Sequence, residues 1–187
     1  MNNLAKWLLL VVVLFAVIVK LAFADPADPL AVNATCAISV TVDSIVEWEG
    51  ANFAALAPDN VTSQAHAPTD SATYTLWTNS NVVLTARNTD IAELTHERGE
   101  AHEDALVTKY MIAFDGDGTA ATGGTDSADW VLYSSFLNPG VAITHVNTDG
   151  AVEITLSVQA TNNPDNVEDT GLYEAEQQLT ATWDSDN

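Results

Sequence analysis

Hydrophobic and polar positions alternate along most of the chain, which is the pattern of a half-buried β-strand. The clearest example is "AVEITLSVQA" at 151–160, where an aliphatic side chain occupies every second position. The stretch "GLYEAEQQLTATW" at 171–183 alternates in the same way, with Tyr173, Leu179 and Trp183 on one face. Further strands are expected over 72–78, 82–87, 106–114, 130–136 and 141–146.

Short segments rich in asparagine, aspartate, glycine and proline separate these strands, among them "NPG" and "NTDG". One polar face on each strand favours antiparallel pairing, because strands of a parallel sheet are usually buried on both faces. The sequence therefore predicts an all-β fold, an antiparallel β-sandwich of the immunoglobulin-like kind with about seven to nine strands.

Two segments depart from the alternation. "DIAELTHERGEAHEDA" at 90–105 predicts a short helical excursion between strands, with Asp90 as its cap and with Ile91 and Leu94 facing the core. The connection at 47–71 predicts a surface loop with at most one helical turn.

The longest alternation begins near the N-terminus. From Leu30 to Val42 the even positions are apolar throughout, which is more than twice the length of an ordinary strand. We therefore expect Cys36–Val42 to form the first strand of the domain, and residues 25–35 to form an extended arm. Pro26 and Pro29 keep such an arm out of helix. An arm with this pattern can add itself to an open sheet edge of another molecule, with Leu30, Val32, Ala34 and Cys36 as the assembly residues.

Residues 1–24 have the features of a secretory signal peptide. Lys6 precedes the apolar run 7–19, and "AFA" at 22–24 fits the small-residue cleavage pattern. A retained N-terminal anchor is the alternative. The expected organisation is thus a signal or anchor over 1–24, the arm over 25–35 and a β-sandwich domain over 36–187, in a secreted or cell-surface protein.

The charge excludes one class of partner. The chain carries 26 acidic and 5 basic residues, for a formal net charge of −21. Such a surface repels nucleic acid and anionic lipid, because it has no cationic patch to replace their counterions. We expect no nucleic-acid partner, and no membrane contact once a signal peptide is removed.

The single cysteine, Cys36, excludes an intrachain disulfide. It shares a face with Ile38 and Val40, which favours a small buried hydrophobic residue. A bridge between the arms of two chains is the second interpretation. Lipidation is disfavoured, because "NAT" before the cysteine lacks the apolar residues that this modification requires.

Two acidic stretches are candidate metal sites. Asp115, Asp117, Asp126 and Asp129 surround several glycines, and such oxygen-rich loops can hold calcium. A solvated acidic loop between two strands explains the same residues. If 90–105 were helical, His96, Glu100 and Glu103 would line one face as transition-metal ligands, although the histidine spacing of a zinc protease motif is absent.

The sequence offers little support for an enzyme. It has neither a GxSxG elbow nor a phosphate-binding loop with its lysine, and we expect no catalytic residues and no cofactor other than calcium. Trp48, Trp77, Trp130 and Trp183 lie on or beside strands, where they can serve as core residues or as a platform for sugars. Asn33 and Asn60 match the acceptor pattern for N-glycosylation.

The two ends of the exported domain resemble a known kind of protein. "NATCAISVTV" near its start and "DTGLYEAEQQLTATW" at its end are similar to segments of fimbrial subunits of the spore-coat-U type, and TasA-like biofilm fibre subunits are similar in style. The resemblance implies a pilin-like sandwich and a structural role, without catalysis. The second cysteine that such pilins usually carry is missing here.

The sequence thus predicts a structural subunit of an extracellular filament, pilus or biofilm matrix. It would form a homopolymer by donating the N-terminal arm to a neighbouring subunit. The alternative is a secreted β-sandwich module that binds calcium or carbohydrate.

Overall fold

A computed structural model describes residues 35–50, 53–98, 104–114, 122–123, 129–145 and 150–185. The chain divides into two units, Met1–Thr41 and Val42–Asn187. The second unit contains all the strands of the described residues. In chain order these are β1 (Val46–Trp48), β2 (Thr69–Thr78), β3 (Asn81–Ala86), β4 (Leu94–His96), β5 (Ala105–Phe114), β6 (Thr122–Gly123), β7 (Val131–Leu132), β8 (Val141–His145), β9 (Ala151–Thr161), β10 (Tyr173–Glu174) and β11 (Leu179–Ser185).

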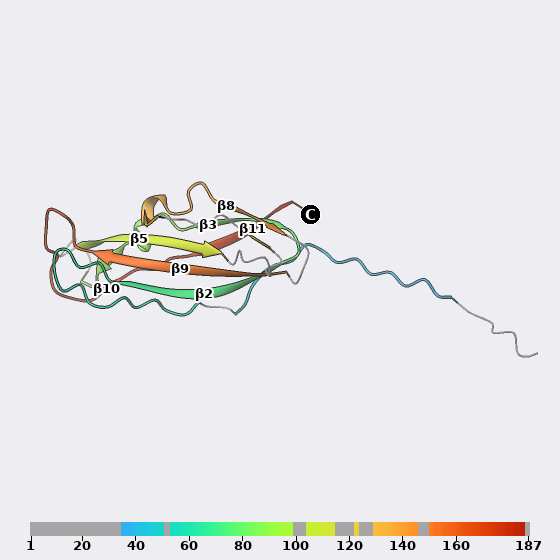
Figure 1. The fold of residues 1–187 in the computed structure, drawn as a ribbon, viewed down its shortest axis with the longest axis horizontal. Coiled ribbons are helices and arrows are strands. Elements are labelled where there is room, and N and C mark those ends of the chain that lie inside the picture. Colours follow the sequence, from blue (N-terminus) through green and yellow to red (C-terminus); the bar gives the residue numbers. More distant parts are fainter. Residues whose placement is uncertain are drawn as a thin grey trace, which may run out of the picture. The chain divides into compact units, whose positions relative to one another are not determined.

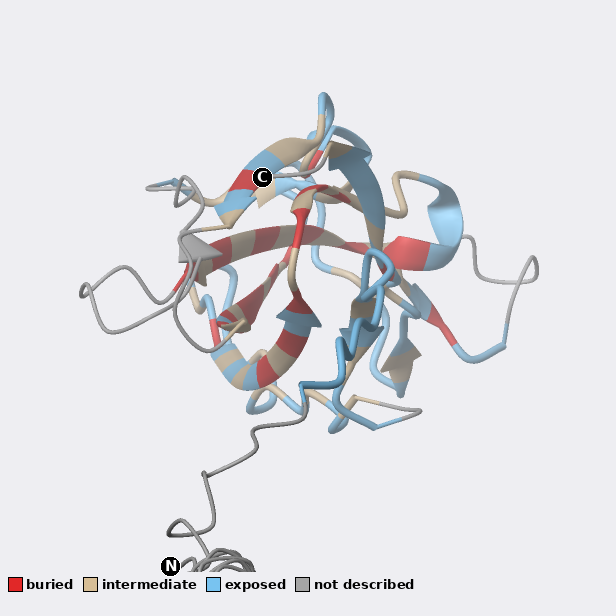
Figure 2. Cartoon of the chain, turned by 90° about the vertical axis from the view of Figure 1, so that its right-hand side faces the viewer, coloured by how far each residue is buried: buried red, intermediate tan, exposed pale blue. Residues whose placement is uncertain are grey.

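The described strands form two antiparallel sheets. The larger has the order β1-β2-β9-β5-β4-β10, with β7 also paired to β5, and the smaller has the order β11-β3-β8-β6. Figure 1 shows β2, β9 and β5 running side by side, with β3, β8 and β11 packed alongside them. The larger sheet curls around the core (Figure 2). The expected all-β, antiparallel class is confirmed.

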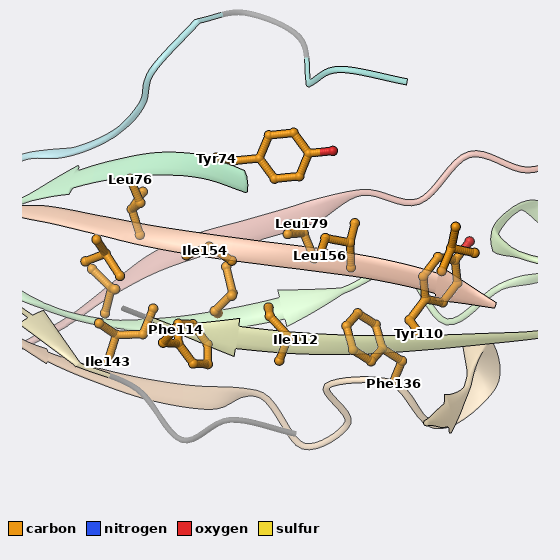
Figure 3. Packing of buried hydrophobic residues seen from close by; sticks show 14 of the residues in the cluster. Tyr74, Leu76, Tyr110, Ile112, Phe114, Phe136, Ile143, Ile154, Leu156 and Leu179 are labelled. Carbon is orange, nitrogen blue, oxygen red and sulfur yellow. The ribbon is translucent and has the colours of Figure 1, made fainter. Parts of the chain in front are cut away.

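Alternation places one face of each long strand in the core. In β5, buried and half-buried residues alternate from Ala105 to Phe114, as the sequence pattern predicts. The core lies between the sheets, because buried residues of β3, β8 and β11 join those of β2, β5 and β9 in one cluster. Figure 3 shows Ile112, Ile154 and Phe136 in this cluster, where the Tyr110 and Phe136 rings lie 5.4 Å apart.

The expected first strand over 36–42 is wrong. Residues 35–45 lie outside any strand, and Ile38, Val40 and Val42 are 91%, 87% and 67% exposed. The register of β1 supplies the reason: Val46 lies opposite Thr78, the last residue of β2, so the β2 ladder offers no partner to earlier residues. Cys36 is accordingly exposed and is not a buried core residue.

Two other strands are shorter than expected. The strand predicted over 130–136 ends at Leu132, and a 3-10 helix, η3, follows at Tyr133–Ser135. The strand predicted over 171–183 is broken, because the chain changes sheets. Glu174 pairs with β4 of the larger sheet, whereas Leu179 pairs with β3 of the smaller.

In residues 90–98 and 104–105, the described part of that segment, the expected helical excursion is also much reduced. A 3-10 helix, η1, spans Asp90–Ala92, and β4 begins two residues later. Ile91 is exposed rather than facing the core. Pairing of Leu94 and Thr95 with β5 outweighs the weak helix pattern. In the described part of the chain, no helix has the length and hydropathy of a membrane span.

Candidate functional site

A groove of about 530 Å³ opens along one side of the second unit. One wall is the segment 53–58, which follows β1, and the other is the segment 175–179, which leads into β11. The floor consists of core side chains from β2, β5 and β9, including Tyr74, Tyr110 and Leu156. The groove is therefore an opening into the hydrophobic core.

Segment 53–58 is fixed against β2 by polar and aromatic contacts. The Tyr74 hydroxyl donates a hydrogen bond to the Ala54 carbonyl at 3.1 Å, and the Asp70 carboxylate accepts one from the Ala57 N–H at 2.7 Å. The Phe53 ring lies 4.1 Å from the Tyr74 ring. The Ala57 and Ser71 N–H groups both stabilise the ionised carboxylate of Asp70, and so hold its pKa below the usual value.

The opposite wall is held by Arg87. Its guanidinium forms an ion pair with Glu176 at 2.7 Å and donates to the Gln178 side chain at 2.7 Å. The Glu176 N–H also donates to the Ile91 carbonyl at 2.7 Å. These contacts tie segment 175–179 to the residues that follow β3.

The strand that continues this wall, β11, is an edge strand. Among the described strands it pairs with β3 alone. The Gln178 carbonyl accepts from the Arg87 N–H, and the Thr180 carbonyl from the Thr85 hydroxyl, so these two residues direct their backbone toward β3. Because backbone groups alternate in direction along a strand, Leu179 and Ala181 direct theirs toward the open edge. β1 comes close to β11 without pairing with it, and an unpaired strand edge of this kind can accept a further strand.

A second hollow of about 520 Å³ lies beside the first, and Pro58 and Leu94 line both. Its rim is polar. The Tyr173 hydroxyl donates to the Asp169 carbonyl at 2.8 Å, and burial followed by the charge of Asp104 raises the pKa of the nearby Glu168 carboxyl. Together, the two hollows are lined on one side by residues between Trp48 and Ser63 and on the other side by residues between Val167 and Leu179.

The residues of the candidate metal sites are mostly outside the described part of the chain. This applies to Asp115, Asp117, Asp126, Glu100 and Glu103, whereas Asp129 is described and exposed. Among the described residues, no group of three or more histidine, cysteine, aspartate or glutamate side chains could hold a metal ion.

His96 is buried at the junction of β4 and β10. Its Nδ1 accepts a hydrogen bond from the Arg98 N–H at 3.1 Å, and its Nε2 lies 3.4 Å from the Thr170 carbonyl oxygen. The Tyr173 ring packs edge-on against it at 5.1 Å. A Cβ at Gly171 would collide with the imidazole, so the loop before β10 needs glycine there. These contacts give His96 a packing role at this junction.

The expected assembly residues Leu30, Val32 and Ala34, and the candidate glycosylation site Asn33, lie outside the described residues. Cys36 and the second candidate site, Asn60, are exposed.

The tryptophans divide into two groups. Trp48 is half-buried and packs edge-on against Phe53 at 4.9 Å, and Trp130 is half-buried as well. Trp77 and Trp183 are 41% and 50% exposed, so neither is buried in the core.

Sequence reasoning missed the groove because segment 53–58 has the composition of a surface loop. The one signal for it is the pair Phe53 and Leu56, apolar residues in a stretch expected to be polar. The chain matches no family model, no curated protein and no solved structure.

Proposed function

We propose that the protein is a structural subunit of an extracellular filament or matrix, and that its subunits join when the N-terminal arm of one enters the groove of the next. The observation that carries the proposal is the groove itself, which opens onto core side chains of β2, β5 and β9 beside β11, a strand that pairs with β3 alone among the described strands. A strand added there would pair with the β11 backbone and bury apolar side chains on the groove floor.

The arm has the pattern that such a groove requires. Its apolar residues recur at every second position from Leu30 to Val42, so one face of an extended arm is apolar throughout. The described part of this stretch exposes Ile38 and Val40 almost completely. Apolar side chains exposed in a row favour a partner surface that covers them.

The donated strand would also complete the fold. With a donated strand between segment 53–58 and β11, the curled larger sheet and the smaller sheet form a β-sandwich of the pilin-like kind. Export after removal of residues 1–24 fits both the apolar run near the N-terminus and the acidic surface. The role is structural, and it requires no cofactor.

Removal of the arm tests the proposal. We expect the mature chain to form filaments visible by electron microscopy, and a variant lacking residues 25–35 to remain monomeric in sedimentation. Assembly of the shortened variant to the same extent as the mature chain would contradict arm donation.

A matched pair of substitutions sharpens this test. Val32→Asp places a charge on the apolar face of the arm, and Asn33→Asp places the same charge on the opposite face. Burying an unpaired carboxylate is costly, so Val32→Asp should abolish assembly whereas Asn33→Asp should preserve it. Equal effects of the two substitutions would argue against a strand that buries one face.

Carbohydrate binding is a second candidate, favoured by the exposure of Trp77 and Trp183. Exposed tryptophans provide the flat apolar faces on which sugar rings stack. Titration with oligosaccharides, followed by tryptophan fluorescence, tests this function. A saturable change that is lost in Trp77→Ala or Trp183→Ala would support a sugar-binding module.

A further inference from the structure

The second hollow, of about 520 Å³, has an apolar floor and takes no part in the proposed assembly. The buried residues Leu106 of β5 and Ala160 of β9 line it, together with half-buried Leu94 of β4. Val167 and Leu172, exposed residues of the loop between β9 and β10, line it as well. Pockets that hold small ligands measure roughly 300–1,000 Å³, so the hollow is large enough for one and offers it apolar surface.

The rim of this hollow is acidic. Three carboxylate side chains line it, those of Asp59, Glu168 and Asp169. The Glu168 carboxyl is hydrogen-bonded to the carboxyl of Asp104, the residue just before β5. Within the described part of the chain, neither Asp104 nor Glu168 has an ion-pair partner. The two residues thus form a carboxyl pair that no positive charge of the described residues neutralises.

The pair holds a proton more firmly than a single carboxyl does. Two carboxyl groups can hydrogen-bond to one another only when one of them is protonated. Burial, followed by the charge of Asp104, raises the pKa of Glu168, and the charge of Asp169 acts in the same direction. A hydrogen bond with the backbone of Asn163 opposes these effects without outweighing them. The Asp169 N–H also donates to Asp104 Oδ2, at 3.3 Å. A cation bound beside the pair can therefore replace the shared proton.

An alkylammonium ion has both of the parts that the hollow matches. Its hydrocarbon chain can lie on the apolar floor, as the stems of lysine side chains lie on apolar surfaces while their charged ends stay in polar surroundings. Its ammonium group has three donors and no acceptor, so it can donate to two carboxylates at once. An anion would be repelled by the rim, and an uncharged apolar molecule would leave the carboxyl pair without a counter-charge.

We propose that the second hollow binds a primary alkylammonium ion, with its charge beside Glu168 and Asp104 and its hydrocarbon chain against Leu94 and Leu106. The site needs neither the arm nor the groove, so it is independent of the proposed assembly. The same chemistry has two sources, a free aliphatic amine and the lysine side chain of another protein.

Calorimetric titration of the mature chain with methylammonium, propylammonium and pentylammonium chloride tests the site. Burial of the hydrocarbon chain should raise the affinity by up to about fourfold for each added methylene group. General attraction to an acidic surface depends on charge alone. Equal affinities for the three ions would therefore overturn the proposal.

Proton release locates the bound charge. In mildly acidic solution, titrations in two buffers of different ionisation enthalpy should show that binding of pentylammonium releases protons. Glu168→Gln removes the shared proton along with the charge, so proton release should disappear and the affinity should fall by at least about tenfold. Asp165→Asn is the control, because Asp165 is exposed on the same loop and does not line the hollow, and it should change neither quantity.

A second variant tests the same placement from the other carboxyl. Asp104→Asn leaves Glu168 on the rim but removes its partner, and it should also weaken binding and suppress proton release. Unchanged affinity and proton release in both Glu168→Gln and Asp104→Asn would overturn the proposal.

A final comparison identifies the source of the ammonium group. The amide of N-acetyl-lysine carries its ammonium on the same four-carbon chain as butylammonium, but this chain is attached to peptide groups. Affinity equal to or higher than that of butylammonium would support a lysine side chain of a partner protein, and a clearly lower affinity would support a free amine. Absence of saturable binding by all of these compounds would overturn the site and leave arm donation standing.

Discussion

Trp183 lies opposite Val82 in the β11–β3 pair, and yet Val82 is 0% exposed and Trp183 is 50% exposed. Residues opposite one another in an antiparallel pair share a face, so Trp183 belongs to the core-facing side of its sheet. The register shifts immediately after it, between Trp183 and Ser185. Trp183 therefore lies two residues before the end of β11, where the core-facing side of the strand is incompletely covered.

This arrangement predicts that assembly shields Trp183. The fluorescence of Trp183 is obtained as the emission of the mature chain minus that of Trp183→Phe. Acrylamide should quench this Trp183 fluorescence less when subunits polymerise. Trp77 is the control, because it is similarly exposed but lies on the outer face of β2. The quenching of Trp77 fluorescence, obtained in the same way from Trp77→Phe, should stay unchanged. Equal shielding of both tryptophans would argue against the covering of the β11 edge in particular.

Tyr74→Phe should weaken the groove wall. The substitution removes the hydroxyl that donates to the Ala54 carbonyl and leaves the ring in place, so the free energy of unfolding should fall by about 1 kcal/mol. Urea unfolding measures this loss, and the critical concentration for assembly should rise with it. Tyr173→Phe removes a hydroxyl that bonds to the Asp169 carbonyl outside the groove, and it should leave assembly unchanged.

Asp70 should make the same wall sensitive to acid. Two backbone N–H groups lower the pKa of its carboxyl in the folded state, so its contribution to stability is present above the pKa of the unfolded chain and is lost as the pH falls through the lowered value. Asp70→Asn should thus destabilise the protein at neutral pH and progressively less in acid. Urea unfolding across a pH series measures this, with the exposed Asp165→Asn as control.

Glu168 should behave in the opposite sense. Burial and the charge of Asp104 raise the pKa of its carboxyl, so the stability that it contributes is greatest below the pKa of the unfolded chain and is lost as the pH rises through the raised value. Glu168→Gln should raise the melting temperature at neutral pH. The gain should vanish at a pH low enough to protonate the carboxyls of both Glu168 and Asp104. A lower melting temperature at neutral pH would contradict this account.

Salt should favour assembly. A formal charge of −21 makes neighbouring subunits repel, and raising sodium chloride from about 0.01 M to about 1 M shortens the screening length from about 30 Å to about 3 Å. The critical concentration measured by light scattering should fall steadily over this range. Potassium chloride should act identically, whereas a sharp response to little calcium would instead indicate a specific site such as the one expected from Asp115 to Asp129.

The long strands were predictable because the alternation of apolar and polar residues is a local pattern of the sequence. β5 and β9 have partners on both sides and a core beneath them, so alternation alone locates them within a residue or so. The same alternation fails at residues 36–42, which pair with none of the described strands, and across 175–178, where the chain passes from one sheet to the other. Alternation records which side chains can be buried together, and it contains no information on whether a neighbouring strand exists.

The candidate site was less accessible from the sequence. A groove is a relation between segments distant in the chain, here 53–58 and 175–179, and its floor residues are ordinary core residues. The roles of His96 and Arg87 were likewise hidden, because each depends on backbone groups brought near by the fold. The arm could be singled out because its pattern is local and exceeds what one strand needs.

The groove and the arm are different surfaces of one chain, and this has a consequence for the form of any assembly built from them. A head-to-tail contact between unlike surfaces leaves one arm and one groove unused at the two ends, whatever the number of subunits. Unless the rotation between neighbours happens to close a ring, the product is an open fibre with two chemically distinct ends. Such a fibre has a direction, and its two ends can grow at different rates and be capped by different molecules.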